Sequence, residues 1–203
     1  KKLLLDARNI SELTHGPQLV YNLLVARRAG TELGRDVALP QSTVHRWLNL
    51  LETSYLLVRL PAYAVNRTKR LIKASKIFWG DTGIALHLAA IEEPTGAHLE
   101  NLVLHDLLAW RDARVERAEL SYWRTASGEE VDFVIESGGQ LLPVEVKSTS
   151  RPRLADAASL RSFRKEYGDQ ARAGLLLHAG DQLEWLAPDV LAAPWWMVAS
   201  CMV

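Results

Sequence analysis

The sequence predicts a mixed α-helical and β-stranded protein (α/β, or α+β) built from two domains at residues 1–92 and 93–203. Helical apolar stripes dominate the first part, whereas strands and a glycine turn dominate the second. Charge is split as well: residues 1–98 carry thirteen Lys and Arg against eight Asp and Glu, and residues 99–203 carry eleven against sixteen. This asymmetry indicates domains with different partners, the basic half being the better candidate for contact with a polyanion.

The composition sets limits on the class of protein. The chain has 203 residues, 48% of them hydrophobic, which is enough to bury a core. The single cysteine, Cys201, excludes an internal disulfide and a cysteine-based zinc site, and it suits a reducing cytoplasm, the location we expect. No apolar run is long enough to span a bilayer and no signal peptide is recognisable, so no membrane partner is expected. The chain begins at Lys1 rather than at a methionine, as a fragment would. The sequence leaves open whether the protein forms a homo-oligomer.

The first domain is expected to contain helical segments between residues 3 and 28, a polar connection, and a helix over residues 39–52. Pro40 fits the first turn of that second helix. Its expected buried stripe consists of Val44, Trp47, Leu48 and Leu51. The residues left at its outer N-terminal part are Gln41, Ser42, Thr43, His45 and Arg46. This layout is typical of the recognition helix of a helix-turn-helix, although a packing helix with a polar end has the same pattern.

Two strands are predicted after this helix, at residues 55–60 and 76–79. Between residues 59 and 79 the chain has six Lys and Arg and no acid. The basic residues of the connecting loop are Arg67, Lys69, Arg70 and Lys73. Two strands joined by a basic loop make a wing that contacts phosphates, and the alternative is a solvated hairpin. A short helix to about residue 90 and a linker at 91–97 complete the first half.

The central feature of the second domain is a predicted hairpin over residues 130–147, with its turn at Gly138 and Gly139. Side chains alternate along a strand, so a turn centred between the glycines pairs Asp132 directly with Glu145. Lys147 lies two residues further along on the side of Glu145. Because like charges directly opposite each other are destabilising, we expect a divalent metal to offset the repulsion.

A third acid, Glu100, begins a predicted helix over residues 98–111. It shares the helix face of an apolar stripe formed by Val103, Leu104, Leu107 and Leu108. A carboxylate on a buried stripe is costly unless it is paired or bound to a metal. The alternative is that Glu100 interacts with the helix dipole and reaches water from the first turn.

The remaining elements complete a mixed sheet flanked by helices. We expect a strand at 120–124, an amphipathic helix at 151–167 with Leu154, Ala158, Leu160 and Phe163 as its stripe, and a buried strand at 173–178. Residues 185–190 and 194–196 close the chain, where Trp195 and Trp196 either complete the core or form an interface patch.

The acids Glu100, Asp132 and Glu145 are predicted to hold one or two Mg²⁺ or Mn²⁺ ions, since hard cations prefer oxygen ligands. Such an ion polarises a phosphodiester and lowers the pKa of a bound water. Lys147 could orient or deprotonate that water, or stabilise transition-state charge.

Asp132, Glu145 and Lys147 resemble the PD-(D/E)xK nuclease signature, with Glu100 as the helical acid of that superfamily; Val131 stands where the signature has proline. Nearly the whole chain resembles the C-terminal region of bacterial and archaeal AAA-type ATPases, in which a winged helix precedes a nuclease-like domain of unknown function. The matching segments are residues 43–48, 51–56, 66–73, 76–83, 100–103, 122–124, 130–132 and 144–147.

The resemblance implies a restriction-endonuclease-like fold in the second domain and an ATPase domain upstream, absent from this chain. Its leading functional implication is a metal-dependent nuclease, with the four residues Glu100, Asp132, Glu145 and Lys147 as the catalytic set, joined to a winged helix that binds nucleic acid, with DNA favoured. Two alternatives are a non-catalytic nucleic-acid or protein binding module that regulates the ATPase, and a winged helix that acts as a protein–protein element of an ATPase assembly.

Overall fold

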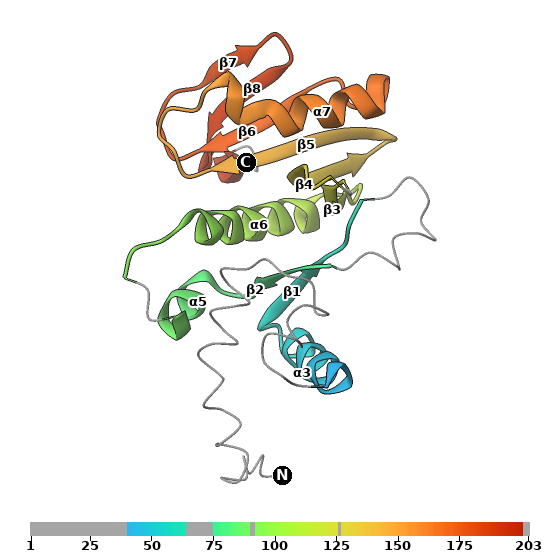
Figure 1. The fold of residues 1–203 in the computed structure, drawn as a ribbon, viewed down its shortest axis with the longest axis vertical. Helices are drawn as coiled ribbons and strands as arrows, with labels where there is room; N and C mark the ends of the chain where they lie inside the picture. Colours follow the sequence, from blue (N-terminus) through green and yellow to red (C-terminus); the bar gives the residue numbers. More distant parts are fainter. Residues whose placement is uncertain (1–39, 64–74, 90–91, 126, 201–203) are drawn as a thin grey trace. The chain divides into compact units, whose positions relative to one another are not determined.

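The computed structural model describes residues 40–63, 75–89, 92–125 and 127–200 (Figure 1). The mixed α and β class expected from the sequence is confirmed. The chain divides into two compact units, of which the first comprises Lys1–Arg59 and Ser75–Glu93 and the second Leu60–Ala74 and Pro94–Val203. The helical segments expected between residues 3 and 28, and the basic loop residues Arg67, Lys69, Arg70 and Lys73, lie outside the described residues.

The described part of the first unit contains a helix, a two-stranded sheet and a second helix. These elements are α3 (Gln41–Thr53), β1 (Leu57–Leu60), β2 (Lys76–Trp79) and α5 (Thr82–Ala89). The Asp81 carboxylate accepts a hydrogen bond from the backbone N–H of Ile84 at 2.7 Å, which satisfies one of the free donors at the start of α5. Arg59 of β1 donates to the Asn49 side chain at 2.8 Å and pairs with Glu52 at 3.3 Å, so it links the strand to α3.

The buried stripe of α3 is narrower than expected. Val44 and Leu48 are buried, but Trp47 is 44% exposed, so its expected burial is wrong. An α-helix turns by about 100° per residue, so Trp47 lies some 60° from Val44 around the helix axis, on the side away from Leu48. It therefore falls at the edge of a stripe whose centre is formed by Val44, Leu48 and the half-buried Leu51.

The second unit is organised around a mixed six-stranded sheet of order β3-β4-β5-β6-β8-β7. Its strands are β3 (Glu119–Arg124), β4 (Glu130–Ser137), β5 (Gln140–Lys147), β6 (Gly174–His178), β7 (Glu184–Ala187) and β8 (Val190–Pro194). The pairs β3–β4, β4–β5 and β7–β8 are antiparallel, whereas β5–β6 and β6–β8 are parallel. Ligands commonly bind beyond the carboxyl ends of parallel strands, and Lys147 and His178 are neighbours at that end of β5 and β6.

The β4–β5 hairpin has the register that the sequence predicts. Ser137 pairs with Gln140 and Phe133 with Val144, so the turn is centred between Gly138 and Gly139. Both glycines have positive φ, 57° and 76°, as a two-residue turn of this kind requires. The pairing ends at Phe133 and Val144, and the same register continued by one residue would place Asp132 level with Glu145.

Helices flank this sheet on both sides (Figure 1). The first is α6 (Gly96–Ala113), which packs against β5 and against α8 (Met197–Ser200). The other side is covered by α7 (Ala158–Tyr167), which is followed by a short turn, η4 (Gly168–Gln170). Phe163 of α7 is fully buried among aromatic rings, with its centroid 5.4 Å from that of Trp123 and 4.3 Å from that of Tyr167.

The expected helix over residues 151–167 begins later than predicted. Residues before α7 form a separate 3-10 turn, η3 (Leu154–Ala157), in which the Asp156 carboxylate accepts a hydrogen bond from the backbone N–H of Arg153 at 2.7 Å. This turn leads directly into α7 but has the tighter winding of a 3-10 helix, about three residues per turn, so the apolar stripe does not keep the phase of an α-helix. Leu154 is 44% exposed and Ala158 is exposed, which corrects the predicted stripe. Leu160 and Phe163 are buried as expected.

The segment after β1 adds to the edge of the second unit. Ala62 forms an isolated parallel bridge with Tyr122 of β3, and the Tyr122 N–H donates to the Pro61 carbonyl at 3.0 Å. The Tyr63 ring lies 6.1 Å from that of Phe163 and 5.3 Å from that of Tyr167. The start of the predicted wing loop is therefore part of the core of the second unit.

Candidate functional site: a buried carboxylate pair with a lysine

Asp132 and Glu145 are two buried acids on neighbouring strands. Their residues are 4% and 6% exposed, respectively. The β4–β5 pairing ends at Phe133 and Val144, and beyond it a side-chain oxygen of Asp132, Oδ2, accepts a hydrogen bond from the Val146 N–H at 3.0 Å. The Asp132 carboxylate thus accepts a hydrogen bond from a backbone N–H of β5 just beyond the last residue pair of the two strands. This hydrogen bond holds Asp132 beside the strand that carries Glu145.

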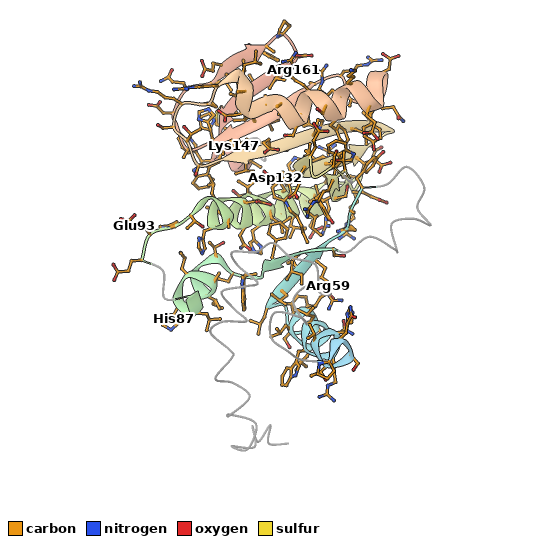
Figure 2. The ribbon with its side chains drawn as sticks, in the orientation of Figure 1. Arg59, His87, Glu93, Asp132, Lys147 and Arg161 are labelled. Carbon is orange, nitrogen blue, oxygen red and sulfur yellow. The ribbon has the colours of Figure 1, made fainter. Side chains whose placement is uncertain are left out.

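Both carboxylate oxygens of Glu145 have protein partners. Lys147 Nζ donates to Oε1 at 2.6 Å, and the Ser159 hydroxyl of α7 donates to Oε2 at 3.0 Å. Figure 2 shows Lys147 and Asp132 within the same part of the sheet. The contact of Lys147 with Glu145 agrees with the prediction that their side chains lie on the same side of the strand. The result is a compact group of two acids, one ammonium and one hydroxyl.

Glu145 titrates far from the ordinary range of a glutamate. Burial, and then the negative charge of Asp132, raise its pKa from 4.5 to about 7, although Lys147 and Ser159 act in the opposite direction. The expected repulsion between the paired carboxylates is therefore present. A carboxyl group with a pKa near neutrality can accept or donate a proton under physiological conditions.

Lys147 is held in its cationic form. Burial lowers its pKa, but the hydrogen bond with Glu145 and the charges of Glu145, Asp132 and Asp156 outweigh this effect, so the net shift is upward. A lysine whose pKa is raised does not act as a base at neutral pH. Of the roles expected for Lys147, charge stabilisation and orientation fit this environment better than deprotonation of a water.

The side chains around Lys147 include donors of the kind that a divalent cation prefers. Asp132 and Glu145 supply hard oxygen donors, and each carboxylate oxygen has two lone pairs, so the hydrogen bonds of Glu145 leave room for coordination. Glu100 is also almost fully buried, but it belongs to α6, whereas the Glu145 carboxylate contacts α7 on the other side of the sheet (Figure 1). In the part of the chain that the structure describes, no three or more His, Cys, Asp or Glu side chains form a group that could hold a metal ion.

Asp132 and Glu145 thus offer oxygen donors of the kind that hard cations prefer, and a cation held by both stays a prediction. Glu100 as a third ligand stays a prediction, and so do Mg²⁺ or Mn²⁺ as the ion.

The predicted nucleic-acid residues of α3 lie near its N-terminal end, and most of them are exposed. The exposed ones are Gln41, Ser42, His45 and Arg46, while Thr43 is half-buried. Within the basic stretch, Arg59 is engaged with α3, and Lys76 is buried with its Nζ 6.0 Å from the Phe78 ring centroid. These two cations are part of the structure of the first unit, so phosphate contact by the wing stays a prediction for the loop residues.

Sequence reasoning missed two groups near Lys147. Ser159 contacts Glu145 directly, and Asp156 acts on Lys147 through its charge. The separation of 14 residues between Ser159 and Glu145 carries no motif. The only feature of the sequence that could have pointed to Ser159 is its position next to Leu160, the first buried residue of the α7 stripe.

Two family models match the chain. The model of a domain of unknown function, DUF4143, matches residues 95–198, and that of a second, DUF8612, matches residues 19–95. The chain belongs to the DUF4143 family, whose domains are found in the C-terminal region of AAA-ATPase-like proteins. The two matches meet at residue 95.

Two curated mycobacterial proteins are similar to this chain. They are the uncharacterized protein Rv2008c of Mycobacterium tuberculosis and the uncharacterized protein Mb2031c of Mycobacterium bovis, each 30% identical over 175 residues. The match covers 82% of this chain but 38% of each relative, so the chain spans well under half of their length. No solved structure matches the chain.

Among the described residues, no helix combines the length and apolar character needed to cross a membrane.

Proposed function

We propose that this chain binds nucleic acid, with DNA favoured, and that its second unit hydrolyses phosphodiester bonds with the help of Mg²⁺ or Mn²⁺. The observation that carries the proposal is the buried pair of Asp132 and Glu145 with the Lys147 ammonium 2.6 Å from Glu145. The membership in a family found in AAA-ATPase-like proteins supports a further part of the proposal, in which an ATPase domain of the same protein drives or regulates the unit.

Each residue has a distinct role in this proposal. A divalent ion, when bound, supplies Lewis-acid polarisation of the phosphodiester and a more acidic water. Asp132, fixed by the Val146 N–H, orients its carboxylate toward the centre. Glu145, restrained by Lys147 and Ser159, would hold the ion together with Asp132, and the proton lost by the attacking water passes to bulk water. Lys147 stabilises the negative charge that develops on the phosphoryl oxygens.

A nuclease assay tests the proposal. Plasmid and single-stranded DNA are incubated with the chain and Mg²⁺ or Mn²⁺, and we expect cleavage that Asp132→Ala and Lys147→Ala each reduce at least about 100-fold. Glu129→Ala is the matched control, because Glu129 is an exposed acid hydrogen-bonded to Ser162 rather than to Glu145. Cleavage that survives both centre substitutions, or no cleavage with either ion, contradicts the proposal.

A second candidate is a nucleic-acid or protein binding module without cleavage. It is favoured by a specific observation: both oxygens of Glu145 are already engaged by protein groups, and no group of three such ligands occurs in the described ranges. In that case the ion pair of the buried Glu145 with the half-buried Lys147 serves the stability of β5. Salt-sensitive DNA binding without cleavage by the same preparation would support this second function.

A further inference from the structure

Ser159 is the hydroxyl that holds the second oxygen of Glu145. It lies in the first turn of α7 and donates to Oε2 at 3.0 Å, while Lys147 donates to Oε1 at 2.6 Å. A carboxylate restrained at both oxygens from two different elements has little freedom to rotate. The direction in which Glu145 presents its remaining lone pairs therefore depends on Ser159 as well as on Lys147.

The packing of α7 fixes the place of this hydroxyl. Leu160 and Phe163 are fully buried against the sheet, and α7 contacts β4, β5 and β6. Ser159 precedes Leu160 directly, so it lies at the margin of the buried stripe, half-buried and within reach of β5. The helix thus brings a polar group to the carboxylate by the same contacts that build the core.

A helix-capping role does not account for this serine. The N-cap residue of α7 is Ala157, and the helix start has no side-chain capping hydrogen bond. The hydrogen bond of Ser159 goes instead to a buried side chain. Ser162 provides a comparison within the same helix, because its hydroxyl donates at 2.9 Å to the exposed Glu129.

We infer that Ser159 is a positioning residue that orients the Glu145 carboxylate for its cation and substrate; this inference rests on the proposed function. Groups that hydrogen-bond a metal-binding carboxylate fix its orientation, and their loss typically lowers metal affinity or activity 10–100-fold. Ser159 makes no contact with the reacting groups in this account, and its effect passes through Glu145.

Three variants of the full chain separate positioning from a structural role. Ser159→Ala removes the hydroxyl, Ser159→Thr restores it, and Ser162→Ala removes the matched hydroxyl from the same helix. We expect Ser159→Ala to weaken Mn²⁺ binding, measured by calorimetry, about 10-fold or more and to lower kcat more than it changes KM. Ser159→Thr should recover at least half of the affinity, and Ser162→Ala should match the wild type.

A crystal structure of Ser159→Ala provides a readout that is independent of metal and activity. We expect the Glu145 side chain to leave the position in which Lys147 contacts Oε1. An unchanged Glu145 together with unchanged Mn²⁺ affinity overturns the inference. If the wild type binds no Mn²⁺ and cleaves nothing, but Glu145 still moves in the variant, the proposed function fails while the positioning role of Ser159 stands.

Discussion

Several interactions of the candidate site meet at the Glu145 side chain. Its carboxylate meets an ammonium, a hydroxyl and the field of a second buried acid, and burial and Asp132 raise its pKa to about 7. Lys147 counters only part of this effect. A carboxyl group tuned in this way is more typical of a functional centre than of a structural ion pair, although structural networks also shift pKa values.

The raised pKa of Glu145 predicts how stability changes with pH. The folded chain binds this proton up to about pH 7, whereas the unfolded chain releases it near the ordinary value of 4.5. Stability contributed by the protonated group is therefore complete below pH 4.5 and declines as the pH rises to 7, by at most about 1.4 kcal/mol per pH unit. Urea unfolding between pH 5 and pH 8 measures this decline.

Glu145→Gln should remove this part of the pH dependence, because the amide keeps the shape of the side chain without the titration. Glu129→Gln, in an exposed position, should leave the pH profile unchanged. Parallel profiles for the wild type and Glu145→Gln would show that Glu145 does not titrate with the raised pKa.

Among the elements, the β4–β5 hairpin was predictable and the start of α7 was not. Two adjacent glycines fix the turn because they adopt positive φ at little cost, and the turn fixes the register of Asp132 and Glu145. The η3 turn depends on a local hydrogen bond to Asp156, which apolar periodicity does not encode. The contact of Ser159 with Glu145 follows from where α7 begins, so the sequence could not reveal it.

Phe163 is the largest fully buried side chain of α7. It is fully buried and lies among the rings of Tyr63, Trp123 and Tyr167. Phe163→Ala removes these contacts and leaves a cavity, so we expect a loss of about 3–5 kcal/mol in the free energy of unfolding. Urea denaturation followed by circular dichroism measures the loss. Leu183→Ala, at a side chain that is 55% exposed, should change it by less than about 0.5 kcal/mol.

At the scale of the whole molecule, the two halves of the sequence, residues 1–98 and 99–203, have opposite charge balance. Thirteen Lys and Arg against eight acids in residues 1–98 give a net charge of +5 there, and eleven against sixteen in residues 99–203 give −5. The sequence could predict this division of charge because it is a property of composition. It could not predict that Ala62 and Tyr63 join the core of the second unit, since this depends on a long-range bridge to Tyr122.

The basic loop predicts a specific salt dependence of DNA binding. If Lys69 and Arg70 each neutralise a phosphate, their joint replacement by alanine lowers the slope of log affinity against log salt by about 2. Fluorescence anisotropy with a labelled duplex over a range of NaCl concentrations measures the slope. Replacing the exposed Lys165 and Arg172 of the second unit makes the same change in net charge and should leave the slope unaltered. Equal slopes for wild type and the loop variant would exclude phosphate contact by these two residues.

The most direct test of the central claim is to locate a cation. Crystals of the chain soaked in Mn²⁺ and measured at a wavelength where manganese scatters anomalously should give a peak within about 2.5 Å of carboxylate oxygens of both Asp132 and Glu145. The peak should be absent from Asp132→Asn crystals treated in the same way. Anomalous density elsewhere, or none at this pair in crystals saturated with the ion, would contradict a metal-dependent centre in the second unit.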